Sequence, residues 1–188
     1  MKKVFAAILV AVGLLLLIFL VIQAQYNRLV SLDQKVAESW SQVQNVLQRR
    51  ADLIPNLVST VKGYARHEKE LFIQVTEARS RLMSAGGVAE TSAADRELSS
   101  ALSRLLVVVE NYPQLKANEN FLRLQDELAG TENRISVERR NYNLAVRDYN
   151  RTVKSIPIVF FIRMLPFDAE KEYFEAAPGA ESVPKVEF

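Results

Sequence analysis

The sequence predicts an all-α protein: an N-terminal transmembrane helix, four long helices and an irregular C-terminal tail. An apolar run without charged residues spans residues 4–22, which is long enough to cross a bilayer. Beyond it, apolar residues recur at three- and four-residue steps up to residue 153, the spacing of helices that pack on one face. No glycine or proline occurs in residues 23–54, so the first helix is expected to leave the membrane directly.

Length and composition limit the function classes. A chain of 188 residues has room for one domain with an anchor and a tail. It has no cysteine, which excludes disulfides, thiolate metal sites and a lipidated cysteine. Its single histidine, His67, cannot supply a zinc site alone, and the net charge of +2 is too small to indicate nucleic-acid binding. No nucleophile elbow or phosphate-binding loop is present, so we predict no catalytic residue, cofactor or metal.

We interpret residues 1–3 as a short flank and residues 4–22 as an uncleaved signal anchor. At 1.5 Å per residue the run is about 28 Å long, which just spans a hydrocarbon core. The alternative is a cleaved signal peptide, whose apolar region is normally shorter. Lys2 and Lys3 place the N-terminus on the cytoplasmic side and the domain outside, although Arg28 and Lys35 weaken this bias.

Residues 23–155 are predicted to form the helical domain. The apolar stripe of its first helix contains Leu29, Leu32, Val36, Trp40, Val43 and Leu47. The second stripe includes Leu71, Val75, Ala78 and Leu82. Residues 84–95 are predicted to be a loop with a helix cap at Thr91 or Ser92 followed by Asp95, and a third helix ends at Tyr112-Pro113. The fourth helix is predicted from about residue 118 to residue 153.

Pro55 interrupts the first helical pattern and allows two readings. The first helix could end near Arg50, with Asp52 capping a second helix that holds Pro55 in its first turn. Alternatively, one very long helix is kinked at Pro55. We favour the helix corner. The later helices are much shorter than one unbroken helix would be, so they could bury its apolar face only if they were placed one after another along its length.

Polar residues occupy the middle of the fourth helix where apolar ones are expected. If the helices pack against one another in opposite directions, this region could face the arginine-rich stretch before Pro55. The hypothesis is a structural polar network, with a partner- or ligand-binding site as the alternative. Its members would be Arg49, Arg50, Asp52, Glu132, Arg139 and Arg140.

Residues 156–188 are predicted to be an apolar cover segment followed by an acidic tail that is extended or mobile. The apolar part, Ile156–Phe167, is too short to span a membrane. It is expected to pack on the helices, or else to touch the membrane or a neighbouring subunit. The candidate contact residues are Ile158, Phe160, Phe161 and Ile162.

Several motifs resemble the LemA family over nearly the whole chain after the anchor. They include Tyr26-Asn27-Arg28-Leu29-Val30, Arg49-Arg50-Ala51-Asp52-Leu53-Ile54-Pro55-Asn56-Leu57-Val58, Val61-Lys62-Gly63-Tyr64-Ala65, His67-Glu68, Ala78-Arg79, Tyr112-Pro113, Thr131-Glu132-Asn133, Arg139-Arg140, Tyr142-Asn143, Tyr149-Asn150 and Phe174-Glu175. The resemblance implies an antiparallel four-helix bundle anchored in the cytoplasmic membrane of a bacterium, and supports the corner at Pro55. It implies no catalytic residues, and it associates the family with membrane remodelling and with a membrane-embedded protease.

Three functions therefore remain open. The first is a non-enzymatic homo-oligomeric scaffold that organises or shapes the membrane lipid of the envelope. The second is an adaptor or regulator of a membrane-embedded protease or another membrane enzyme. The third is a peptide- or lipid-binding module that uses the polar middle of the bundle.

Overall fold

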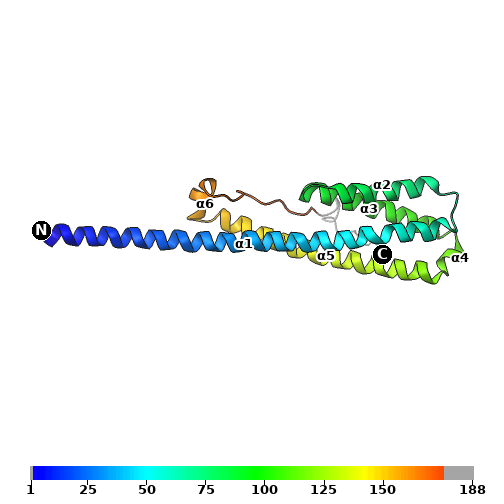
Figure 1. The fold of residues 1–188 in the computed structure, drawn as a ribbon, viewed down its shortest axis with the longest axis horizontal. Helices are drawn as coiled ribbons and strands as arrows, with labels where there is room; N and C mark the ends of the chain where they lie inside the picture. Colours follow the sequence, from blue (N-terminus) through cyan, green and yellow to red (C-terminus); the bar gives the residue numbers. More distant parts are fainter. Residues whose placement is uncertain (1, 176–188) are drawn as a thin grey trace, which may run out of the picture. The chain divides into compact units, whose positions relative to one another are not determined.

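The computed structural model describes residues 2–175, without the side chains of residues 2–4, 6 and 7. The all-α prediction is confirmed for this part of the chain, and residues 176–188, most of the predicted acidic tail, lie outside it. Figure 1 shows the elements in order. They are α1 (Lys2–Lys62), α2 (Lys69–Ser84), α3 (Val88–Val109), α4 (Pro113–Lys116), α5 (Glu119–Val153), α6 (Ile158–Phe161) and the 3₁₀ turn η1 (Ile162–Met164).

The described residues divide into two compact units. The anchor unit contains residues 2–38 and 144–171, and the bundle unit contains residues 39–143 and 172–175. The helices α1 and α5 each contribute one part to the anchor unit and the other part to the bundle unit.

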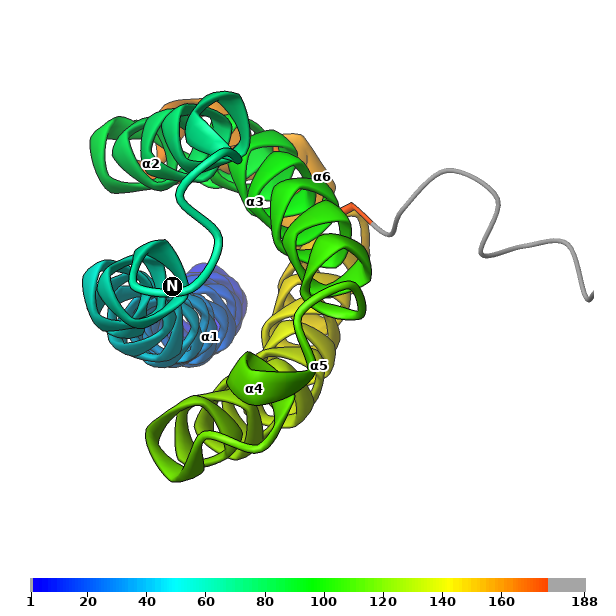
Figure 2. The ribbon, with the colours of Figure 1, turned by 90° about the vertical axis from the view of Figure 1, so that its right-hand side faces the viewer.

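In the bundle unit, α2, α3 and the first part of α5 follow one another around the last part of α1 (Figure 2). Short connections between successive helices reverse the chain direction. The apolar stripes predicted from the sequence face inward, because burying them removes apolar surface from water. The buried residues include Val43, Leu47, Ile54, Leu57, Val61, Phe72, Val75, Leu98, Leu105, Phe121 and Ile135.

The helix corner predicted at Pro55 is wrong, because α1 continues through this residue to Lys62. Proline has no N–H, so the carbonyl of Ala51, four residues earlier, loses its helical donor. Arg79 of α2 supplies the missing hydrogen bond: its Nε donates to the Ala51 carbonyl oxygen over 2.7 Å. Because α2 packs against α1, the Ala51 carbonyl keeps a hydrogen-bond donor, and the main energetic cost of the proline is removed. The helix can therefore continue through Pro55.

The connection between α2 and α3 is shorter than predicted. It consists of residues 85–87, and α3 already begins at Val88. Gly87, with φ of +116°, adopts a conformation that residues with a side chain rarely reach. Thr91 and Ser92, predicted as the helix cap, lie inside the helix instead; the Thr91 hydroxyl donates to the carbonyl of Gly87. The glycine, and not a capping side chain, sets the start of α3.

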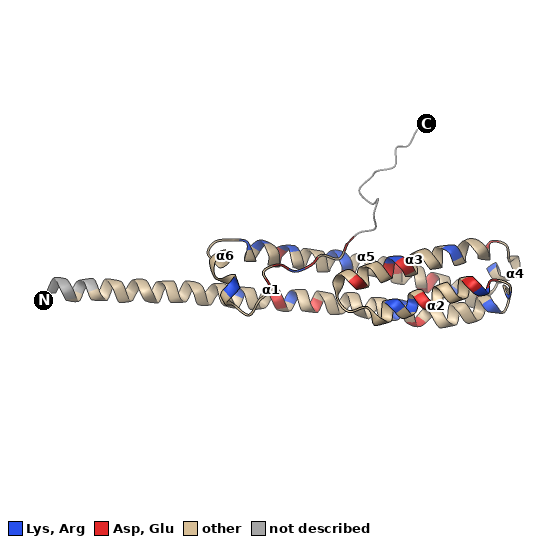
Figure 3. Cartoon of the chain, turned by 90° about the horizontal axis from the view of Figure 1, so that it is seen from above, with Lys and Arg blue, Asp and Glu red and all other residues tan. Residues whose placement is uncertain are grey.

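The anchor unit is built around the first part of α1. This helix is long and apolar enough to cross a membrane. Its most apolar stretch has a mean hydropathy of 2.7, and the rest of the chain buries none of its residues. Figure 3 shows that the N-terminal part of α1 whose side chains are described carries no charged residues before the first basic ones near α6. Past the apolar run, the stripe residues Leu29 and Val36 are buried, as are Tyr149 and Val153 in the last part of α5. The short elements α6 and η1 follow, and their Ile158 and Ile162 are buried too.

Candidate functional site

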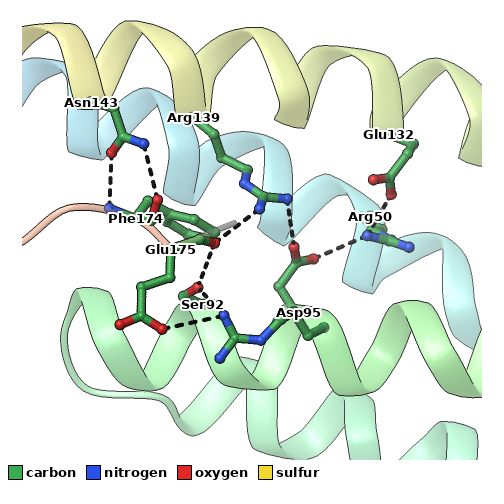
Figure 4. A network of polar contacts seen from close by, with 9 residues as sticks. Arg50, Ser92, Asp95, Glu132, Arg139, Asn143, Phe174 and Glu175 are labelled. Carbon is green, nitrogen blue, oxygen red and sulfur yellow. Dashed lines mark hydrogen bonds and ion pairs between the residues drawn. The ribbon is translucent and has the colours of Figure 1, made fainter. Parts of the chain in front are cut away.

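The centre of the polar network is a carboxylate that the sequence prediction did not include. Asp95 lies on α3 and is 1% exposed. Its Oδ1 accepts a hydrogen bond from Nη1 of Arg50 on α1 at 3.0 Å, and its Oδ2 lies 3.6 Å from Nη1 of Arg139 on α5. Nη1 of Arg50 also lies 2.8 Å from Oε2 of Glu132. Figure 4 shows the four side chains joined across three helices.

The charges of this network balance: two arginines face two carboxylates. Burial raises the pKa of Asp95 above its ordinary value of 3.8, opposed by the attraction of Arg50 and Arg139. Arg50 is itself 5% exposed, and its Nε is buried without a hydrogen-bond partner among the described residues. The Arg50 guanidinium is therefore stabilised by its ion pairs with Asp95 and Glu132. Removing either carboxylate would leave its positive charge buried and poorly compensated.

A C-terminal segment, residues 172–175, extends the same network. The backbone oxygen of Glu175 accepts hydrogen bonds from Ser92 Oγ and Arg139 Nη2, both at 3.2 Å. The Arg139 guanidinium also stacks on the ring of Phe174, 4.5 Å from its centre. The Asn143 side chain makes two hydrogen bonds with the Phe174 backbone. Its Nδ2 donates to the carbonyl oxygen at 3.0 Å, and its Oδ1 accepts from the backbone nitrogen at 2.9 Å. The network thus fixes a segment that has no helical structure of its own (Figure 4).

The structure brings together three of the six predicted network residues: Arg50, Glu132 and Arg139. The other three lie outside the buried network. Arg49 pairs at 3.9 Å with Glu127, and both side chains are more than half exposed. Asp52 accepts a hydrogen bond from Gln48 and lies 4.0 Å from Arg79. Arg140 is exposed and forms no ion pair with another described residue.

The sequence predicts that Asp95 takes part in a helix cap, but it also contains a second signal, which indicates a buried charge. Asp95 lies four residues after Thr91, three before Leu98 and seven before Leu102, all of which are buried with it on one face of α3. An acidic residue on an otherwise apolar helix face indicates a buried charge that needs a partner. Phe174 and Asn143 occur in the quoted motifs, but no periodicity connected them to each other.

A separate surface feature of the bundle unit is an open groove of about 680 Å³ between the end of α1 and the start of α2. Its apolar wall contains Phe72 and the half-exposed Ile73, and three basic side chains surround it. The lining residues are Lys62, Arg66, Lys69, Phe72, Ile73, Thr76 and Glu77. We define these residues as the basic groove. No group of three or more metal-binding side chains occurs among the described residues.

The four candidate contact residues of the apolar segment divide into two pairs. Ile158 and Ile162 are 4% and 5% exposed, so they cannot contact a membrane or neighbouring subunit, and this part of the prediction is wrong. Phe160 and Phe161 are exposed as a contact surface requires. The difference follows from the helical turn: Ile158 and Ile162, four residues apart, face the protein. Phe160 is 68% exposed, and Phe161 is 40% exposed and also lines a cavity against α1.

Comparison with known proteins supports the membrane association. The chain is similar to magnetosome protein MamQ 2 of Paramagnetospirillum magneticum, with 25% identity over 184 residues that cover 84% of this chain and 67% of the relative. A second relative is magnetosome protein MamQ of Magnetospirillum gryphiswaldense, with 23% identity over the same shares of the two chains. Protein LemA of Metamycoplasma hominis is 26% identical over 129 residues, 68% of this chain and 58% of the relative.

These relatives agree with the resemblance read from the motifs. Together with the apolar helix found near the N-terminus of the described residues, they support a single-pass membrane protein. Two of the names refer to the magnetosome and one to LemA, and none of the three describes a reaction. The LemA family profile matches residues 39–188, four-fifths of the chain. The chain therefore belongs to the LemA family.

Proposed function

We propose that this LemA-family protein is a non-enzymatic scaffold of the bacterial cytoplasmic membrane, whose copies associate side by side. Lys2 and Lys3 favour a cytoplasmic N-terminus and a bundle on the extracytoplasmic side. The relatives named magnetosome proteins support a role in organising a membrane. The observation that carries the proposal is the basic groove, whose apolar wall is bordered by three cations and by Glu77.

A second copy offers a surface of matching chemistry. On the first turns of α5, Leu122 is 45% exposed, with the exposed acids Glu119 and Asp126 three residues before it and four after it. This spacing places all three on one face of the helix. The leucine could occupy the apolar wall of the groove while the two acids pair with its cations.

The two surfaces lie at the same end of the bundle unit. Asn118, just before α5, donates a hydrogen bond at 3.0 Å to the hydroxyl of Tyr64, which lies between α1 and α2. Copies anchored in one membrane have the same orientation, so the groove of one copy and the acidic face of the next can meet side by side. A contact between different surfaces of identical copies can repeat, which gives rings or rows.

The test is the mass of the full-length protein in mild detergent, measured by light scattering with the detergent subtracted. We expect a homo-oligomer, discrete if the contact closes a ring, that Ile73→Asp dissociates, because a buried charge in the apolar wall is strongly unfavourable. Val137→Asp is the matched control: Val137 is 46% exposed against 56% for Ile73, lies on α5 and does not line the groove. The control should keep the oligomer.

Charge exchange tests the pairing of the surfaces. Lys69→Glu and Asp126→Lys should each weaken the oligomer, and the double variant should restore part of it. A monomer at every concentration would reject the scaffold. A defined complex with one copy of a membrane protease or other enzyme would then favour the adaptor role, which the same groove could serve.

A further inference from the structure

The segment that follows α5, residues 156–164, exposes large apolar side chains. Ile156, Phe160 and Met164 are 78%, 68% and 83% exposed, and Val159 and Phe161 are about two-fifths exposed. The buried Ile158 and Ile162 hold the segment on the anchor unit from the other side. A soluble domain normally covers such a cluster, so this surface faces something other than water.

This apolar surface lies beside the end of the membrane span. Pro157, Ile158, Phe161, Met164 and Leu165 line a cavity of about 120 Å³. Its opposite wall consists of Ile22, Gln25, Tyr26 and Leu29 of α1. Ile22 is the last residue of the apolar run, and Leu29 lies only about 10 Å further along the helix axis. The segment therefore begins at the level where the hydrocarbon core ends.

The polar residues around this surface are those that a membrane interface favours. The ring of Tyr26 is 38% exposed and packs 5.5 Å from the ring of Phe167. Arg163 is exposed within the segment itself, and Arg28 and Arg151 line a neighbouring groove with Asp148. Tyrosine is enriched at the headgroup level, and arginines there bind lipid phosphates.

We infer that residues 156–164 form a second membrane contact, in which Ile156, Phe160 and Met164 enter the lipid next to the transmembrane part of α1. Interfacial helices bury their apolar face about 5–10 Å into the boundary between headgroups and acyl chains. The distance of about 10 Å from Ile22 to Leu29 along α1 lies at the upper end of this range. The lipid is the expected occupant because the apolar surface is continuous with that of the span. This contact orients the anchor unit on the membrane and does not depend on self-association.

The chain contains no cysteine, so a spin label can be placed at single positions of the full-length protein. We would label Phe160→Cys and Met164→Cys in nanodiscs of phosphatidylethanolamine and phosphatidylglycerol that hold one copy each. Leu17→Cys, 60% exposed in the span, is the lipid reference. Val107→Cys, 70% exposed on α3, is the water reference. Collisions with oxygen report lipid, and collisions with a nickel chelate report water.

At positions 160 and 164 we expect a ratio of oxygen to nickel collisions severalfold above that at position 107 and between that value and the ratio at position 17. A ratio equal to that at position 107 would place the segment in water and overturn the inference. Shielding from both reagents would place the side chains against protein and would also overturn it. Since Met164 is 83% exposed, Met164→Cys should leave the melting curve unchanged. The melting curve of Phe160→Cys is compared with it to show that this variant is folded as well.

Discussion

Arg79 donates a hydrogen bond from Nε to the carbonyl oxygen of Ala51, the acceptor that Pro55 leaves without a helical donor. Ala51 is fully buried, so water cannot take over this role. An unsatisfied buried acceptor costs about 1–3 kcal/mol, enough to favour a break in the helix. The long α1 therefore depends on a side chain from the neighbouring helix.

We expect Arg79→Ala to lower the free energy of unfolding by about 1–3 kcal/mol. In a Pro55→Ala background the same change should cost less, because the new N–H at position 55 satisfies Ala51. Denaturant unfolding of the four proteins gives the coupling energy. Arg81→Ala, which removes an exposed pair with Glu97, is the control and should be nearly neutral. An equal cost of Arg79→Ala in both backgrounds would contradict this account.

Removing the charge of Asp95 should destabilise the bundle strongly. Asp95→Asn leaves the buried Arg50 without its closest buried partner, and breaking such a pair costs about 3–5 kcal/mol. Asp52→Asn is the control, because the Asp52 side chain is 58% exposed and lies 4.0 Å from its arginine; its cost should stay within about 0.5 kcal/mol. Thermal unfolding followed by circular dichroism compares the two. Equal melting of both variants would show that the network contributes little to stability.

Phe174 should anchor the C-terminal segment. Its ring is 2% exposed and lies between Arg139 and Trp40, 6.3 Å from the Trp40 ring. Phe174→Ala removes this buried ring, and we expect faster hydrogen exchange of the backbone amides of residues 172–175. Tyr173→Ala, at a neighbouring position that is 43% exposed, should leave exchange nearly unchanged. Unchanged exchange in both variants would mean that the backbone clamp of Asn143 is sufficient.

Lys171 gives the anchor unit a pH-dependent contribution. Burial lowers its pKa, but hydrogen bonds and attraction from Asp168 and Asp33, at 2.6 and 3.0 Å, outweigh this and raise the pKa above its ordinary 10.5. The folded state then holds the proton more tightly than the unfolded state. The resulting stability is complete below pH 10.5 and is lost as the pH rises through the folded pKa.

We therefore expect wild-type protein to be more stable than Lys171→Met at pH 8, with a gap that narrows above pH 10.5. Denaturant unfolding at a series of pH values measures the gap, and comparing the two proteins cancels the titration of other groups. Lys116→Met, which removes an exposed pair with Glu110, is the control. A gap that is constant with pH would contradict the role of the ammonium charge.

Part of the candidate site could be predicted from the sequence because charge on a helix face is a local signal. Arg50, Glu132 and Arg139 break an apolar pattern, and the structure joins them through Asp95. The sequence could not separate Arg49 from Arg50, since one position along a helix turns a side chain by about 100° and decides burial. Nor could it show that Asn143 clamps Phe174, a contact between residues 31 positions apart.

The sequence by itself determined the all-α class, the apolar span, the helical stripes and the family, because periodicity and composition are properties of neighbouring residues. Only the tertiary structure decided whether α1 breaks at Pro55, which arginines are buried, and which side of residues 156–164 is left exposed. Each of these depends on a partner from a distant part of the chain. Arg79 preserves the helix, Asp95 fixes Arg50, and Ile22 to Leu29 of α1 face the segment that leaves Phe160 and Met164 uncovered.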